Sequence, residues 1–170
     1  MTASRSDLRI RAAAEVDIPG IVRCSAALLA EDAAARDPEV DPEWPLREGH
    51  AAFAATLGDP AFLLLVAVTA EPSDVVGYLI GLINEPVGVL PIRSAVLRAL
   101  YVDPSHRRGG TGTRLTAEFL GWARQQDATR AEVNAYSTNE DSLRFYRAQG
   151  FTPRAVRLDL PLAPPSPAPS

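Results

Sequence analysis

A glycine-rich turn behind two arginines holds the residues of this chain whose types and spacing best suit chemistry. It reads Arg107-Arg108-Gly109-Gly110-Thr111-Gly112. Glycines remove the Cβ atoms that would keep an anion away from the main chain, and they allow backbone angles closed to other residues. The arginines add charge-assisted donors that suit phosphate. If a helix starts after the turn, its first N–H groups and its dipole also face the anion, so the turn predicts a phosphate site.

The flanks of the turn favour such a helix. Residues 95–102 are an apolar run that stops at Asp103-Pro104, as a buried strand does. After the turn, apolar residues recur at the spacing of one helix face, at Leu115, Phe119, Trp122 and Ala123. The dinucleotide pattern G-x-G-x-x-G is absent, and the chain has no lysine to complete an NTPase phosphate loop. A plain nucleotide-binding module is therefore disfavoured.

Two spaced motifs point to one family. Arg107, Gly110 and Gly112 fit R-x-x-G-x-G, and residues 139–151 fit N-x-x-S-x-x-F-Y-x-x-x-G-F. With both motifs in this order, the chain resembles the GNAT superfamily of N-acetyltransferases, which bind the pyrophosphate of acetyl-CoA with such a turn. The resemblance reaches to about residue 160 and implies an enzyme with acetyl-CoA as cosubstrate.

The resemblance also implies roles for single residues. In the family, the pantetheine arm of the cofactor lies between two diverging strands, here 95–102 and 130–136. The residues expected to bind the cofactor are Leu100, Tyr101 and Val102 by their backbone, Arg107, Arg108, Gly109, Gly110, Thr111, Gly112 and Thr113 at the pyrophosphate, and Asn139 and Ser142 at a helix start. Tyr146 matches the tyrosine that stabilises the departing CoA thiolate. Because a phenol pKa near 10 exceeds a thiol pKa near 8.5, we expect Tyr146 to donate a hydrogen bond rather than transfer its proton fully.

Local sequence leaves structural explanations open for these residues. An apolar strand can be plain core, Asn139 and Ser142 can cap a helix, and Tyr146 can pack beside Phe145. The general base is also open, because 94–102 lacks the carboxylate that many relatives place there. The candidates are Glu132, Asn134 and Tyr136 on one strand face, Glu85, His50, and the acids of the 31–48 segment.

Composition bounds the class of protein. With 170 residues, 46% hydrophobic and 22% charged, the chain is sized for one soluble globular domain. It lacks an apolar run long enough for a membrane span and a signal-peptide core, so we expect a cytoplasmic protein without a membrane partner. Cys24 is the single cysteine and the two histidines are scattered, which argues against disulfides and a metal site. A net charge of −4 disfavours nucleic acid as a partner.

The charges are unevenly placed. Residues 28–48 carry seven acids against two arginines, whereas 93–114 carry five arginines against Asp103 alone. In the family the first of these regions shapes the acceptor pocket, so we expect a cationic small acceptor such as a polyamine or an aminoglycoside-like amine. An acidic surface without a ligand is the plain alternative. The rival functions are acetylation of a protein or peptide and non-catalytic sensing of acyl-CoA.

The order of elements predicts an α/β (α+β mixed) fold. Strand and helix patterns follow one another as β-α-α-β-β-β-α-β-α-β, with a hairpin turn at 71–74 and a closing strand near 151–160. The GNAT resemblance implies a twisted, mostly antiparallel sheet of six to seven strands flanked by four helices. We expect a single domain over 1–160 and a Pro/Ser-rich disordered tail over 161–170. The closing strand is a candidate element for a homodimer.

Overall fold

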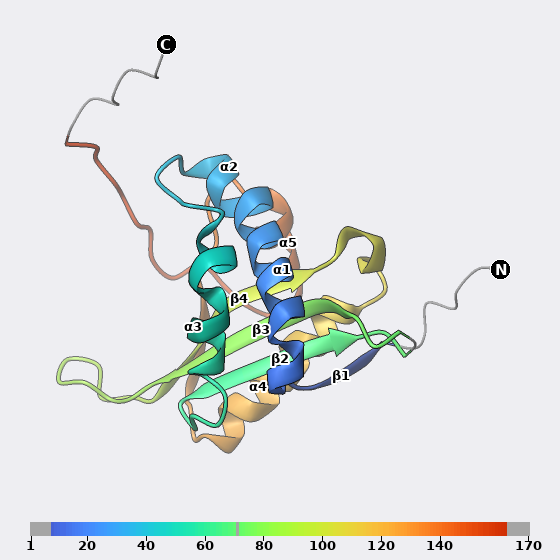
Figure 1. The fold of residues 1–170 in the computed structure, drawn as a ribbon. Coiled ribbons are helices and arrows are strands. Elements are labelled where there is room, and N and C mark those ends of the chain that lie inside the picture. Colours follow the sequence, from blue (N-terminus) through green and yellow to red (C-terminus); the bar gives the residue numbers. More distant parts are fainter. Residues whose placement is uncertain (1–7, 71, 163–170) are drawn as a thin grey trace, which may run out of the picture.

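The computed structural model describes residues 8–70 and 72–162, and its centre is one five-stranded sheet. The strands are β1 (Arg9–Ala12), β2 (Phe62–Val68), β3 (Val75–Asn84), β4 (Ser94–Val102) and β5 (Arg130–Val133). They lie side by side in chain order (Figure 1). The pairs from β1 to β4 are antiparallel, and β4 and β5 are parallel. The predicted mixed, mostly antiparallel sheet is confirmed.

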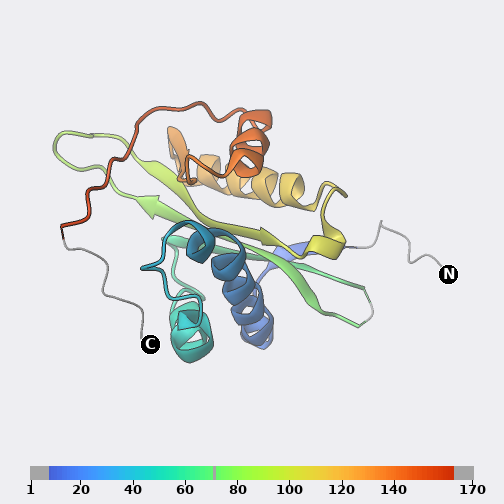
Figure 2. The same ribbon diagram turned by 90° about the horizontal axis from the view of Figure 1, so that it is seen from above.

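Helices cover both faces of the sheet. One layer holds α1 (Ile18–Leu28), the π-helical turn η2 (Leu29–Ala33), α2 (Ala34–Arg36), the π-helical turn η3 (Pro45–Gly49) and α3 (His50–Ala54). The opposite layer holds α4 (Thr111–Gln125) and α5 (Glu140–Ala148), as Figure 2 shows. Short 3-10 turns lie at η1 (Glu15–Asp17) and η4 (Pro104–His106). Since α1, η2 and α2 run on continuously, as do η3 and α3, four helical segments flank the sheet as expected.

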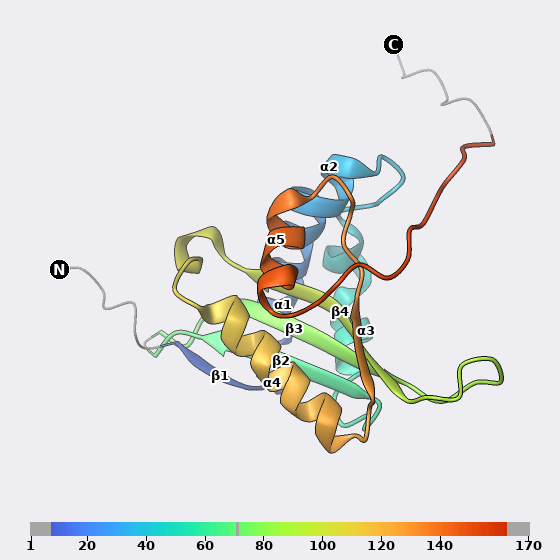
Figure 3. The ribbon, with the colours of Figure 1, turned by 180° about the vertical axis from the view of Figure 1, so that it is seen from behind.

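The alternation of apolar residues along the strands divides the core in two. On β2, Leu64 and Val66 pack with α1 and α3, whereas Leu65 and Ala67 face α4. Successive side chains of a strand point to opposite faces, so a continuous apolar run supplies both layers. On the α4 side the helix lies very close to β3, and a Cβ added at Gly81 would come within 2.9 Å of the Phe119 ring. This approach fixes α4 against the sheet (Figure 3).

The closing strand predicted near 151–160 is wrong, and the sheet has five strands rather than six or seven. Residues 151–162 belong to no strand, and no strand of the described chain pairs with the outer edge of β5. Val156, Leu158 and Leu160 alternate as strand residues do, yet each is at least 80% exposed. Pro153 contributes to this, because it has no backbone N–H to donate to a ladder. Most of the expected 161–170 tail lies outside the described residues.

Candidate functional site

The hydrogen-bonded pairing of β4 and β5 stops part-way along β4, and the unpaired region beyond it is referred to as the gap. The last paired residues are Leu97 and Val133. Next to them Arg98 is an extra residue in β4, since Leu97 faces Gly81 and Ala99 faces Ile80 on β3. Such a bulge bends its strand and increases the local twist. It therefore separates the far half of β4 from the chain that follows β5, as the diverging strands of the prediction require.

The backbone of β4 offers bonding groups to this gap. The Asp103 N–H donates to the Val76 carbonyl at 2.8 Å, and the Tyr101 carbonyl points toward Gly77, so both residues face β3. Backbone groups alternate in direction along a strand, and those of Leu100 and Val102 consequently face the gap. Of the three residues expected to hold the pantetheine arm, these two have the suitable orientation.

The glycine turn leads from β4 into α4 with its donors uncovered. Gly110 is the N-cap of α4 in the left-handed region, at φ +80°, and no side chain caps the helix. The N–H groups of Thr111, Gly112 and Thr113 therefore remain available in the first turn. A Cβ built on Gly109 or Gly110 would meet nothing within 4 Å, so there is open space above the backbone. These features fit a pyrophosphate group, which needs close approach to several N–H donors.

Arg108 and Arg107 leave the turn in different situations. Arg108 has φ +61°, a conformation rare for a residue with a side chain, and its side chain has no partner among the described residues. Arg107 is fully engaged: its Nε donates to the Val102 carbonyl at 2.7 Å, and Nη1 and Nη2 donate to the two carboxylate oxygens of Glu31 at 2.6 and 2.8 Å. Its guanidinium also lies 5.4 Å from the centre of the Tyr101 ring. The bond to Glu31 raises the pKa of Arg107.

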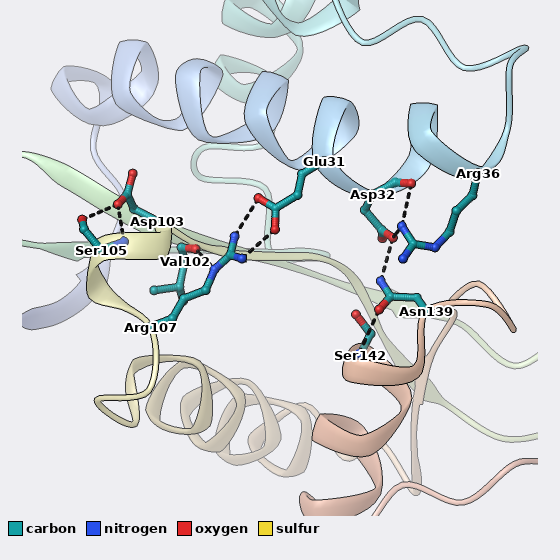
Figure 4. Close-up of polar contacts among 9 residues, drawn as sticks. All are labelled: Glu31, Asp32, Arg36, Val102, Asp103, Ser105, Arg107, Asn139 and Ser142. Atoms are coloured by element: carbon teal, nitrogen blue, oxygen red, sulfur yellow. Dashed lines mark hydrogen bonds and ion pairs between the residues drawn. The ribbon is translucent and has the colours of Figure 1, made fainter.

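Asn139 and Ser142 form the start of α5. The Asn139 Oδ1 accepts a hydrogen bond from the Ser142 backbone N–H at 3.1 Å, so Asn139 is the N-cap. Its Nδ2 donates to Asp32 Oδ1 at 2.7 Å, and the same oxygen accepts from Arg36 at 2.8 Å. Figure 4 shows Glu31 and Asp32 extending from one helical segment toward the two sides of the gap. The capping explanation for Asn139 therefore holds, and the residue also contacts the acidic segment.

Tyr146 lies on α5 with its ring wedged between aromatic neighbours. The rings of Phe145 and Phe151 meet it edge-on at centroid distances of 5.2 and 5.8 Å. Burial, and then the negative charge of Asp32, raise the pKa of Tyr146 to about 12. Its phenol therefore keeps its proton near neutral pH and can donate a hydrogen bond there.

The structure places the acidic candidate bases in two regions. Glu85, which pairs with Arg93, and Glu132 line the same open depression of about 490 Å³ beside the β3–β4 hairpin. Among the candidates, Asp32 is the one whose charge raises the pKa of Tyr146, and its carboxylate accepts the hydrogen bond from Asn139. In the sequence it was one of seven acids in the run, and the spacing held no signal that singled it out. No group of residues suited to a metal ion occurs in the described chain.

Comparison with known proteins decides the family. Residues 27–151 match the model of the acetyltransferase (GNAT) family. The chain belongs to the GNAT family. The matched region contains the π-helical turn, the diverging strands, the glycine turn and α5, so every element of the candidate site lies within it. The family and fold expected from the two motifs are confirmed.

The individual proteins that this GNAT chain resembles include acetyltransferases. It is 31% identical to aminoglycoside N(6')-acetyltransferase type 1 of Serratia marcescens over 102 residues, which are 60% of this chain and 62% of that protein. The chain thus spans less than two thirds of this curated relative. Among solved structures, the fold matches a putative acetyltransferase from Pyrococcus furiosus with TM-score 0.73 and 20% identity, covering 92% and 100% of the two chains. It also matches an aminoglycoside acetyltransferase from an uncultured soil sample in complex with trehalose, with TM-score 0.67 and 20% identity, covering 92% of this chain and 97% of the other.

No helix within residues 8–70 and 72–162 has the length and apolar character needed to cross a bilayer.

Proposed function

We propose that this chain transfers the acetyl group of acetyl-CoA to a primary amine by direct attack within a ternary complex. One observation carries the proposal: the backbone-lined gap between β4 and β5 leads directly onto the uncapped first turn of α4, with Tyr146 on the neighbouring helix. Membership of the GNAT family supports the same reaction.

The donor side would be held mostly by main chain. When bound, acetyl-CoA supplies the activated acyl group as a thioester. The backbone of Leu100 and Val102 would pair with amides in the gap, while the N–H groups at 109–113 and the Arg108 side chain would bind the pyrophosphate. Backbone donors are fixed before the ligand arrives, so little ordering is needed on binding.

Tyr146 would donate a hydrogen bond to the sulfur that leaves. With a pKa of about 12, against about 8.5 for a free thiol, its proton would stay on the phenol while the bond stabilises the thiolate. The attacking amine must be neutral. For an amine of pKa ~10.4, losing the proton at pH 7 costs roughly 4–5 kcal/mol, whereas an α-amine near 7.8 costs about 1 kcal/mol.

The acceptor would be a cationic small molecule of the polyamine or aminoglycoside type. Glu31 and Asp32 bring two carboxylates to the gap, where they could hold ammonium groups that do not react. The likeness to an aminoglycoside N(6')-acetyltransferase supports this class. The proposed setting is the cytoplasm, where the exposed 151–162 segment would be available to a second copy in a homodimer.

Release of free thiol from acetyl-CoA, followed across a panel of amines, tests the function. We expect turnover with polyamines or aminoglycosides and a steep fall in rate as salt rises, because added ions screen the carboxylates. A preference for neutral or acidic amines, or for peptides, would refute the acceptor class. Tight acetyl-CoA binding with no thiol release from any amine would favour the sensor.

A further inference from the structure

The π-helical turn η2 joins the two sides of the candidate site. Its consecutive residues Glu31 and Asp32 bond Arg107 on the β4 side and Asn139 on α5 (Figure 4). A π-helical turn inside an α-helix is uncommon and often marks a functional position. Here it lets two adjacent carboxylates reach residues that belong to the expected binding surface for the donor.

The Glu31 carboxylate has the shape of the ligand that Arg107 is expected to bind. Arg107 is anchored by its Nε on the Val102 carbonyl, so its two terminal nitrogens form a fixed fork. Both nitrogens are taken by the two oxygens of Glu31. A phosphate group presents the same pair of oxygens to such a fork, so the carboxylate and a phosphate compete for it.

The position of Arg107 favours an internal anion as its partner. The guanidinium lies against the ring of Tyr101, and the Arg107 side chain is only 38% exposed. A partly desolvated charge without a partner is costly. The Glu31 side chain is more open, at 46% exposed, so it is the partner that water reaches more easily when the pair separates.

We infer that Glu31 is a latch that occupies Arg107 until the pyrophosphate of the donor displaces it, after which its carboxylate is free to bind an ammonium group of the acceptor. This inference rests on the proposed function. Donor and acceptor binding are then positively coupled, and the acceptor binds best after the donor. By linkage, each ligand raises the affinity for the other by the same factor.

The latch predicts that removing it strengthens donor binding. By calorimetry with CoA as the probe, Glu31→Gln should bind CoA about two- to fivefold more tightly than the wild type, the range set by the worth of a partly exposed ion pair. Glu31→Asp keeps the charge but shortens the reach, so it should also tighten binding. Glu118→Gln, on the exposed face of α4, removes the same charge elsewhere and should leave CoA affinity unchanged.

Three results would overturn the latch. CoA affinity that stays the same or falls in Glu31→Gln would mean that Glu31 only positions Arg107. Tightening in Glu31→Gln but not in Glu31→Asp would point to charge repulsion at a distance. If Glu31→Gln tightens CoA binding by the same factor in the wild type and in the Arg107→Gln variant, competition for the guanidinium is excluded, because a true latch requires both partners.

Coupling is tested with spermine as the cationic probe. Saturating CoA should tighten spermine binding to the wild type, and this gain should vanish in Glu31→Gln; a gain that persists in the variant, or no gain in the wild type, contradicts the coupling. The proposed function fails separately. Tighter CoA binding by Glu31→Gln without acetylation of any amine keeps the latch and refutes the reaction. Acetylation of spermine together with unchanged CoA affinity in Glu31→Gln supports the reaction and refutes the latch.

Discussion

Replacing Tyr146 by phenylalanine removes one oxygen and leaves the ring packing in place. The ring lies edge-on to Phe145 and Phe151, and these contacts do not involve the hydroxyl. We therefore expect the Tyr146→Phe variant to fold and to bind acetyl-CoA as the wild type does. Any loss should appear in the rate of the chemical step.

The magnitude follows from the pKa of the phenol. Moving a proton from a group of pKa about 12 to a thiolate of pKa about 8.5 is uphill by roughly 5 kcal/mol, so full transfer is not the route. A hydrogen bond from the phenol to the developing thiolate is worth about 1.5–3 kcal/mol. Its loss should lower kcat about 10- to 150-fold with little change in the KM for acetyl-CoA.

Thiol release measured from pH 6 to pH 10.5 tests both parts. Because burial raises the pKa of Tyr146, the phenol stays protonated through this range, and the profiles of wild type and Tyr146→Phe should have the same shape. An unchanged kcat would remove Tyr146 from the mechanism. An alkaline fall near pH 9–10 that disappears in Tyr146→Phe would show that the phenol ionises there and would refute its role as a permanently protonated donor.

Three further predictions concern the turn and the fold. Gly110→Ala should lower the free energy of unfolding in urea by about 1–2 kcal/mol, because Gly110 has a φ of +80°. Gly109→Ala should keep the stability of the wild type but weaken CoA binding at least about tenfold, because its Cβ would block access to the backbone N–H groups. Equal stability of the two variants would contradict this prediction. Asp17 is 5% exposed and paired with Arg11, so Asp17→Asn should lose about 2–3 kcal/mol at pH 7. The pair lowers the pKa of Asp17, so its contribution is present above about pH 4 and is lost as pH falls through the lowered value; denaturation at pH 7 and pH 3 should show wild type and variant converging. Gly81→Ala should lower stability by about 1–3 kcal/mol, measured by thermal unfolding, and an unchanged midpoint would mean that α4 shifts freely.

Elements defined by local pattern were predicted closely from the sequence. The apolar run expected at 95–102 is β4 within one residue, because turn residues end the run. The spacing of Leu115 and Phe119 predicted α4, and both are fully buried. The closing strand is wrong because an alternating pattern specifies two faces of a strand but provides no partner strand, and residues 151–162 form no ladder.

The site divides in the same way. The glycine turn could be found because its donors, its arginines and its helix are consecutive in the chain. The contacts that cross the gap could not. Glu31 and Arg107 are 76 positions apart, and Asp32 and Asn139 are 107 apart, so only the folded sheet brings them together. The bulge at Arg98, which opens the gap, likewise has no local signature beyond an exposed arginine in an apolar strand.

The two arginines of the turn illustrate how one motif can serve two purposes. Arg108 has a left-handed backbone conformation. Its side chain makes no hydrogen bond or ion pair with the described residues, so it can bind an anion without first breaking a bond. Arg107 is partly desolvated against Tyr101 and cannot stay unpaired at low cost. An internal carboxylate solves that problem in the free protein, and any acid nearby would have sufficed for stability. Its position on the helical segment that also carries Asp32 means that exchanging it for phosphate alters the acidic side of the gap, so filling the donor site changes what the acceptor meets.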